Sequence, residues 1–208
     1  MPATEHLRSA AIAVAVTLSL AIGAGAQTPG TDHISIDNFA RVSATYYRGA
    51  QPEGSDYAAL AQLGVKTVIN LIGDEDLDGR EQRSVEAAGM RYVNIPMTTH
   101  KTPTPAQIDQ FLSIVNGSAS QPVYVHCVGG RHRTGVMTAV YRMTQDGWNA
   151  DQAFAEMQKY KFGPAFLHST LKDFVYDYYA HNDRRVVPPA VVATAVGSGL
   201  QRSLAVKQ

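Results

Sequence analysis

The chain has 208 residues, with 18 Lys and Arg against 18 Asp and Glu, and it contains a single cysteine. This length is enough for one domain with a full hydrophobic core, and the neutral balance excludes both the basic footprint of a nucleic-acid-binding protein and a polybasic membrane patch. A single cysteine excludes an intramolecular disulfide, so the core alone has to hold the fold together.

Residues 1–26 carry the pattern of a secretory signal peptide. Arg8 gives a weak positive start, residues 10–22 are apolar, and residues 24–26 read Ala-Gly-Ala, a cleavage site of the A-x-A type. We expect cleavage here, export to a bacterial periplasm, and no stable membrane insertion of the mature chain, because the apolar stretch is short for a span. An uncleaved anchor or an unstructured leader stays open as the alternative, since Glu5 cancels the charge of Arg8.

The rest of the chain divides into three parts. Residues 27–36 form a turn-rich linker, residues 37–183 form a folded domain, and residues 184–208 are expected to be a poorly ordered tail. Alternating strand and helix patterns predict an α/β fold, a three-layer α/β/α sandwich around a mostly parallel sheet of about four to five strands. The predicted strands cover residues 39–42, 45–47, 65–72, 92–95 and 123–125, and the predicted helices cover residues 55–64, 80–88, 105–115, 134–143, 149–160 and 166–179.

Local signals mark the starts of two of these helices. Thr104, Pro105 and Gln107 form a capping box with proline at the first helical position. Ser55 is expected to cap the first helix through its side chain. The aromatic and leucine side chains of the last helix, residues 166–179, are expected in the core because their spacing is that of a buried helix face.

The most informative stretch of the chain covers residues 123–135. An apolar strand ends at Cys127, a loop with Gly129 and Gly130 follows, and a helix begins after Arg133. The first N–H groups of a helix lack intrahelical partners, and the helix macrodipole adds positive potential there. The five residues between Cys127 and Arg133 are enough to wrap the backbone around one tetrahedral oxyanion, and the guanidinium can hold two of its oxygens.

This positive environment predicts a nucleophilic thiolate. It lowers the pKa of Cys127, and the Thr134 hydroxyl could donate to the sulfur when it leaves. The alternative is a buried core cysteine, because a Cys and an Arg at this spacing occur often by chance. The preceding strand, His126, the glycines and the following helix together favour an anion-binding catalytic loop.

The sequence His126-Cys127-x5-Arg133-Thr134-Gly135 resembles the loop of the protein tyrosine and dual-specificity phosphatase superfamily. Its interior is most similar to the plant-and-fungal atypical dual-specificity phosphatases and their bacterial relatives, which include enzymes acting on inositol pyrophosphates and on phosphoproteins. The resemblance implies the cysteine-phosphatase fold and a phosphocysteine intermediate on Cys127. It also implies transition-state stabilisation by Arg133, help from Thr134, and hydrogen-bond support of the loop by His126.

The phosphate-binding residues that follow from this resemblance are Val128, Gly129, Gly130, Arg131, His132 and Arg133. The side chains of Arg131 and His132 are interpreted as positive charge for a multiply charged substrate, with two solvent-facing side chains as the alternative. Arg48, in a stretch that also resembles the family, either lines the site or serves a structural role. No metal or other cofactor is expected, because His126, His132 and Cys127 lack the spacing of a closed zinc site.

One departure from the family pattern concerns the general acid. The loop at residues 96–105 usually supplies an aspartate in this family, and none is present. His100 is the first candidate for the proton donor, and the acidic residues at 74–78 are the second. The alternatives are an exposed loop histidine and a solvated acidic turn. A phosphoanhydride leaves more easily than a phosphate ester, which favours an inositol-pyrophosphate-type substrate.

Two main functions follow from these patterns. The first is a monomeric, cysteine-dependent phosphatase that hydrolyses phosphotyrosine, phosphoserine or phosphothreonine in proteins, or inositol (pyro)phosphates. The second is a catalytically weak phospho-binding module, because the usual aspartate is absent. A rhodanese-like sulfur-transfer loop is a third interpretation, and the Arg-Thr-Gly exit into a helix argues against it.

Overall fold

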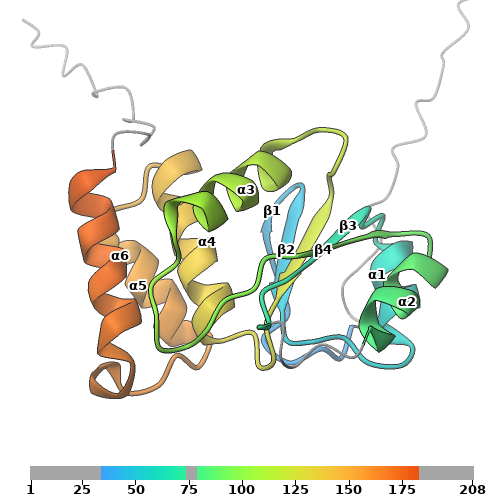
Figure 1. The fold of residues 1–208 in the computed structure, drawn as a ribbon, viewed down its shortest axis with the longest axis horizontal. Helices are drawn as coiled ribbons and strands as arrows, with labels where there is room; N and C mark the ends of the chain where they lie inside the picture. Colours follow the sequence, from blue (N-terminus) through green and yellow to red (C-terminus); the bar gives the residue numbers. More distant parts are fainter. Residues whose placement is uncertain (1–33, 74–78, 183–208) are drawn as a thin grey trace, which may run out of the picture.

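The computed structural model describes residues 34–73 and 79–182 (Figure 1). The predicted signal peptide, most of the linker, the acidic residues at 74–78 and the C-terminal tail therefore lie outside the described residues. Within the described residues, no helix is long and apolar enough to cross a membrane.

A five-stranded sheet forms the centre of the fold. The strand order is β1-β2-β5-β3-β4, and every neighbouring pair is parallel except β1 with β2. The predicted mostly parallel sheet is therefore confirmed. The strands are β1 (Ala40–Ser43), β2 (Tyr46–Gly49), β3 (Thr67–Asn70), β4 (Arg91–Asn94) and β5 (Val123–His126).

Helices cover both faces of the sheet, which confirms the three-layer α/β/α architecture (Figure 1). α1 and α2 lie on one face, α3 and α4 lie on the other, and α5 and α6 pack against α4. The helices are α1 (Asp56–Gln62), α2 (Arg80–Ala87), α3 (Pro105–Asn116), α4 (His132–Gln145), α5 (Ala150–Lys159) and α6 (Ser169–His181), with a short 3-10 turn, η2 (Ala165–His168), before α6.

Strand alternation divides the apolar side chains between the two layers. Successive side chains of a strand point to opposite faces, so Tyr46 enters the core under α3 and α4, whereas Tyr47 enters the core under α1 and α2. Ile69 and Val68 divide in the same way. Every residue of β2, β3 and β5 is buried, as expected for strands that are covered on both faces.

The helix ends follow the sequence signals in part. The capping box of α3 is confirmed, because the Thr104 hydroxyl accepts the N–H of Gln107 at 3.3 Å and the Gln107 side chain accepts the N–H of Thr104 at 2.7 Å. The side-chain cap by Ser55 is wrong. Ser55 occupies the cap position of α1 without a cap hydrogen bond, and the carboxylate of Asp56 accepts the N–H of Glu53 instead.

The expectation that the aromatic and leucine side chains of the last helix lie in the core is wrong at Phe166, Leu167 and Tyr176. Phe166 and Leu167 are 78% and 63% exposed, because they lie in η2, which precedes α6. The helical face that packs on α4 starts only with α6, where Leu171 and Val175 are fully buried.

The parallel register brings four strand ends to one edge of the sheet. Gly49 pairs with His126, His126 with Asn70, and Asn70 with Asn94. The loops that leave these strands therefore meet at their carboxyl ends, which is where ligands bind in open α/β sheets.

Candidate active site

The loop between β5 and α4 carries the predicted nucleophile. We call residues 127–133 the Cys–Arg loop, since it starts at Cys127 and ends at Arg133 in the first turn of α4. Cys127 is 3% exposed and lies against the core under α3 and α4. The loop thus joins a buried strand to a helix N-terminus, as the sequence predicts.

Three carbonyl groups of the Cys–Arg loop are held from outside by donors of other segments. The N–H of Gln51 donates to Val128 O at 3.1 Å, Asn38 Nδ2 donates to Gly129 O at 2.7 Å, and Arg48 Nη2 donates to Gly130 O. Because the carbonyl groups point toward these donors, the loop is left to present N–H groups to the sulfur and to an anion.

The donors Asn38 and Arg48 have distinct backbone and side-chain environments. Asn38 has a positive φ of 55°, a conformation that Asn tolerates better than most residues. Arg48 is fully buried, and its guanidinium lies 4.1 Å from the centre of the Tyr160 ring. Burial holds the pKa of Arg48 below its usual range. Arg48 therefore holds the Gly130 carbonyl group on the outer side of the loop. Of the two roles considered for Arg48, this is the structural one.

The surroundings of Cys127 favour its thiolate. Burial by itself raises the pKa of the thiol, but the Thr134 hydroxyl, the N–H groups of Thr134 and Arg131, and the charge of Arg133 together lower the pKa below its ordinary value. The buried Thr134 hydroxyl has no oxygen or nitrogen partner among the described residues, so it is available to the sulfur.

The guanidinium of Arg133 is placed by two strand ends. Its Nη1 donates to Met97 O at 3.2 Å and to Leu71 O at 3.4 Å, just beyond β4 and β3. Its Nε is buried and has no partner among the described residues, which leaves a donor for an oxyanion.

A model of the family described as "DSP-PTPase phosphatase fused to NAD+ Kinase" matches residues 31–173. The chain belongs to this family. The match includes the whole Cys–Arg loop and each residue that holds it.

Curated relatives agree with this phosphatase family. The chain is 33% identical over 126 residues to the dual specificity protein phosphatase TpbA of Pseudomonas aeruginosa, covering 61% of this chain and 56% of TpbA. It is 28% identical over 134 residues to the inositol diphosphatase SIW14 of Saccharomyces cerevisiae, covering 62% of this chain and 47% of SIW14. The chain thus spans about half the length of these two relatives.

Solved structures of the same two relatives share the fold. The crystal structure of P. aeruginosa TpbA matches with a TM-score of 0.58 and 31% identity over 69% of this chain and 85% of that chain. The core catalytic domain of S. cerevisiae SIW14 matches with a TM-score of 0.61 and 24% identity over 69% of this chain and 86% of that chain. The predicted cysteine-phosphatase fold is therefore confirmed.

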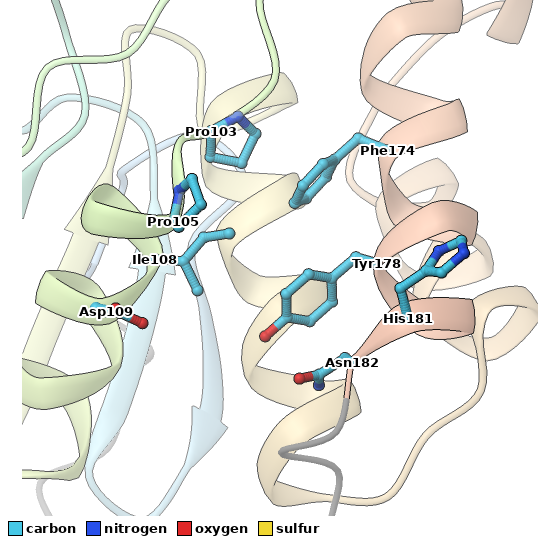
Figure 2. A pocket seen from close by; sticks show the side chains of 8 residues that line it. All are labelled: Pro103, Pro105, Ile108, Asp109, Phe174, Tyr178, His181 and Asn182. Atoms are coloured by element: carbon cyan, nitrogen blue, oxygen red, sulfur yellow. The ribbon is translucent and has the colours of Figure 1, made fainter.

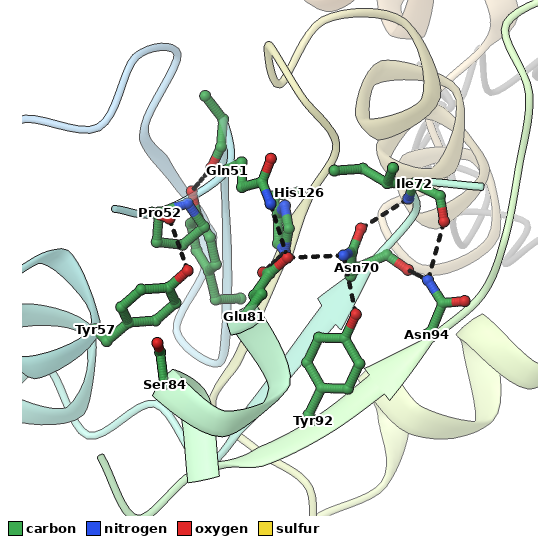
Figure 3. Close-up of polar contacts among 12 residues, drawn as sticks. Gln51, Pro52, Tyr57, Asn70, Ile72, Glu81, Ser84, Tyr92, Asn94 and His126 are labelled. Atoms are coloured by element: carbon green, nitrogen blue, oxygen red, sulfur yellow. Dashed lines mark hydrogen bonds and ion pairs between the residues drawn. The ribbon is translucent and has the colours of Figure 1, made fainter. Parts of the chain in front are cut away.

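His126 is fully buried, and it lies next to Glu81 (Figure 3). Its Nε2 lies 2.6 Å from Oε1 of Glu81 on α2, and its ring stacks on Tyr124 with 5.8 Å between the ring centres. This placement agrees with a supporting role for His126 and gives it no route to the substrate as a proton donor.

The side chains of Arg131 and His132 both have partners in the folded chain. Arg131 Nη2 lies 3.8 Å from Asp37, which also binds Lys161 at 2.7 Å. The His132 ring packs 3.8 Å from the His168 ring, and its Nε2 lies 3.0 Å from Phe162 O. Burial, aided by the charge of His168, lowers the pKa of His132, which favours the neutral ring. The His132 ring is thus packed against its neighbours, and its role in recognising substrate charge stays a prediction.

The general acid stays a prediction. His100 is exposed, and its backbone N–H lies 3.4 Å from the Thr98 hydroxyl. Among the described residues, no hydrogen bond or ion pair joins His100 to Cys127 or Arg133. The second candidate, at residues 74–78, lies outside the described residues.

A separate pocket of about 290 Å³ lies between α3 and α6 (Figure 2). Pro103, Pro105, Ile108 and Phe174 give it a largely apolar lining, and none of its lining residues belongs to the Cys–Arg loop.

In the described part of the chain, no three His, Cys, Asp or Glu side chains are grouped so that they could hold a metal ion.

Three residues of the site were not predicted from the sequence: Asn38, Gln51 and Glu81. Gln51 belongs to the stretch that resembles the family, but no local pattern indicates its contact with Val128. A signal was available for Asn38, because Asn before a strand often adopts a positive φ. Glu81 reads as an ordinary charged residue in the first turn of a helix.

Gly130→Ala tests the packing of the Cys–Arg loop. Gly130 has a φ of 63°, and an added Cβ would lie 2.4 Å from the backbone of Gly49. We expect the variant to lose about 1–3 kcal/mol of stability and most of its phosphatase activity, because the loop has to shift. Thermal unfolding and hydrolysis of p-nitrophenyl phosphate measure the two effects.

Gly129→Ala is the matched control for this substitution. A Cβ at Gly129 would meet the flexible side chain of Arg131 at 3.3 Å, and the backbone there is not left-handed. We expect a much smaller loss on both readouts. Equal losses in the two variants would contradict the packing of Gly130 on Gly49.

Proposed function

We propose that the chain is a phosphatase that forms a phosphocysteine on Cys127. The thiolate attacks phosphorus, and the bond from phosphorus to the leaving oxygen breaks. Arg133 and the loop N–H groups hold the remaining phosphoryl oxygens. Water then attacks phosphorus, the sulfur–phosphorus bond breaks, and the Thr134 hydroxyl stabilises the departing thiolate. The observation that carries this proposal is the set of donors that face the sulfur and lower its pKa.

The leaving oxygen needs a proton in the first step. The loop at residues 96–105 contains no Asp or Glu, so His100, a group at residues 74–78 or water has to supply it. A positioned acid contributes about 10²- to 10⁴-fold to such a step. Activity is therefore expected to be higher with good leaving groups than with alkyl phosphates.

We propose a phosphorylated protein side chain as the substrate class. TpbA, a relative of this chain, is a dual specificity protein phosphatase, and SIW14 is an inositol diphosphatase. Protein substrates are favoured because Asp37, which lies beside both Arg131 and Lys161, offsets one of the two positive charges next to the loop. A highly anionic inositol pyrophosphate needs more positive charge at that place than the one net charge that remains.

We propose that the chain is exported and that its first 26 residues are removed. The support is the apolar stretch at residues 10–22 followed by Ala-Gly-Ala at residues 24–26. A bacterial periplasm then contains the mature enzyme, and its substrate has to be exposed to that compartment.

Cys127→Ser and Arg133→Lys test the chemistry. We expect Cys127→Ser to hydrolyse no p-nitrophenyl phosphate and still to bind vanadate, because the amide groups remain. Arg133→Lys is expected to lower kcat/KM about 10²- to 10³-fold, since an ammonium cannot hold two oxygens side by side. Activity of Cys127→Ser comparable to that of the native chain would refute the phosphocysteine step. Binding of phosphate without turnover by the native chain would indicate a phospho-binding module.

A substrate panel with Asp37→Asn tests the substrate class. We expect the native chain to hydrolyse a phosphotyrosine or phosphoserine peptide with a higher kcat/KM than an inositol pyrophosphate. Asp37→Asn frees Arg131 and Lys161, so it is expected to raise activity on the inositol pyrophosphate more than on the peptide. A native preference for the inositol pyrophosphate at physiological salt would rule out the proposed class.

Intact-mass measurement of the chain expressed in a bacterium tests export. We expect the periplasmic fraction to contain a product that begins at Gln27. Val16→Arg places a charge in the apolar stretch and is expected to keep the full-length chain in the cytoplasm. A native chain that keeps Met1 would show that the segment is not removed.

A further inference from the structure

A buried carboxylate, that of Glu81, lies next to His126, the residue before the Cys–Arg loop (Figure 3). Glu81, in the first turn of α2, is 8% exposed. Its Oε1 lies 2.6 Å from Nε2 of His126, the residue that precedes the nucleophile. The contact is an ion pair when Nε2 carries a proton, because an ionised carboxylate only accepts.

The second oxygen of Glu81 has two donors of its own. Asn70 Nδ2 donates to Oε2 at 2.8 Å, and Gln51 Nε2 donates to it at 3.0 Å (Figure 3). A buried carboxylate is costly unless such partners compensate it. Three side chains from three different segments therefore converge on one group, two by hydrogen bonds to Oε2 and His126 by its close approach to Oε1.

Each of these three partners is also connected to the Cys–Arg loop. Gln51 donates its backbone N–H to Val128 O at 3.1 Å. Asn70 precedes Leu71, whose N–H donates to His126 O at 2.9 Å and whose carbonyl accepts from Arg133. His126 is bonded covalently to Cys127. One carboxylate thus connects the first two residues and the arginine end of the loop.

We propose that Glu81 is a positioning residue for the nucleophile, which it holds in place through His126, Gln51 and Asn70. The proposal rests on the proposed function only in taking Cys127 as the nucleophile. Glu81 touches neither the sulfur nor the phosphate. It fixes the His126 ring and the two flanking strand ends, so that the Cys127 sulfur stays within reach of its amide and hydroxyl donors.

Two opposite effects on the Cys127 thiol separate this role from a simple charge effect. Loss of a negative charge near the sulfur favours the thiolate and so lowers its pKa. Loss of the positioning moves the sulfur away from its donors and so raises its pKa. The other charged groups near the sulfur are Arg133 on α4 and Arg48 on β2. The substitution leaves both of them in place, so they contribute equally to the thiol pKa of the native chain and of the variant.

Glu81→Gln tests the proposal, with Glu86→Gln as the matched control. Glu86 lies on the same helix and is exposed. The rate of alkylation by iodoacetamide against pH reports the thiol pKa directly, because Cys127 is the single cysteine. We expect Glu81→Gln to raise this pKa by about one unit, which corresponds to about a tenfold lower thiolate fraction below the pKa. Its kcat/KM for p-nitrophenyl phosphate is expected to fall at least as far.

A lowered or unchanged thiol pKa in folded Glu81→Gln would overturn the proposal, and so would an equal effect of Glu86→Gln. If circular dichroism shows that Glu81→Gln is unfolded, nitrogen NMR of the native chain decides, because the proposal requires a proton on Nε2 of His126. A deprotonated Nε2 would overturn it. Neither alkylation nor NMR needs turnover, so an inactive native chain would refute the proposed function and leave this inference to be judged separately.

Discussion

The site depends on the direction of three peptide groups. Val128, Gly129 and Gly130 turn their carbonyl oxygens outward, and donors from residues 38, 48 and 51 hold them there. A peptide group that points its oxygen one way points its N–H the other way, so the outer hydrogen bonds form the inner anion site. The loop is therefore preorganised before any substrate arrives, which is the condition for electrostatic stabilisation of a transition state.

The chemistry of the loop could be predicted because its determinants are adjacent in sequence. Cys127, Arg133 and Thr134 lie within one strand-to-helix connection, and strand alternation and the Thr104 capping box define the elements around it. Local reasoning did not predict the surroundings of His132, because a loop histidine beside an arginine has the same sequence pattern whether it is exposed or packed. His132 next to Arg131 looks like surface charge, and the folded chain shows a ring packed on His168.

The remaining parts of the site could not be predicted because their partners are distant in sequence. Asn38 binds Gly129 across 91 positions, and Arg48 binds Gly130 across 82 positions. A single sequence contains no signal for such pairs, since the parallel strand order that brings them together is a property of the whole sheet. Glu81 meets His126 for the same reason, because α2 and β5 become neighbours only through β3.

A carboxylate behind a thiolate is unfavourable at first sight, because two anions repel each other in a medium of low dielectric constant. The arrangement is stable since each group has partners of its own: Thr134 and two amide groups for the sulfur, and two side-chain donors and the nearby His126 ring for Glu81. Removing one donor leaves a buried charge without a partner, which costs more than the same change at the surface. This explains why polar residues such as Asn70 and Gln51 occupy the carboxyl edge of an otherwise apolar sheet.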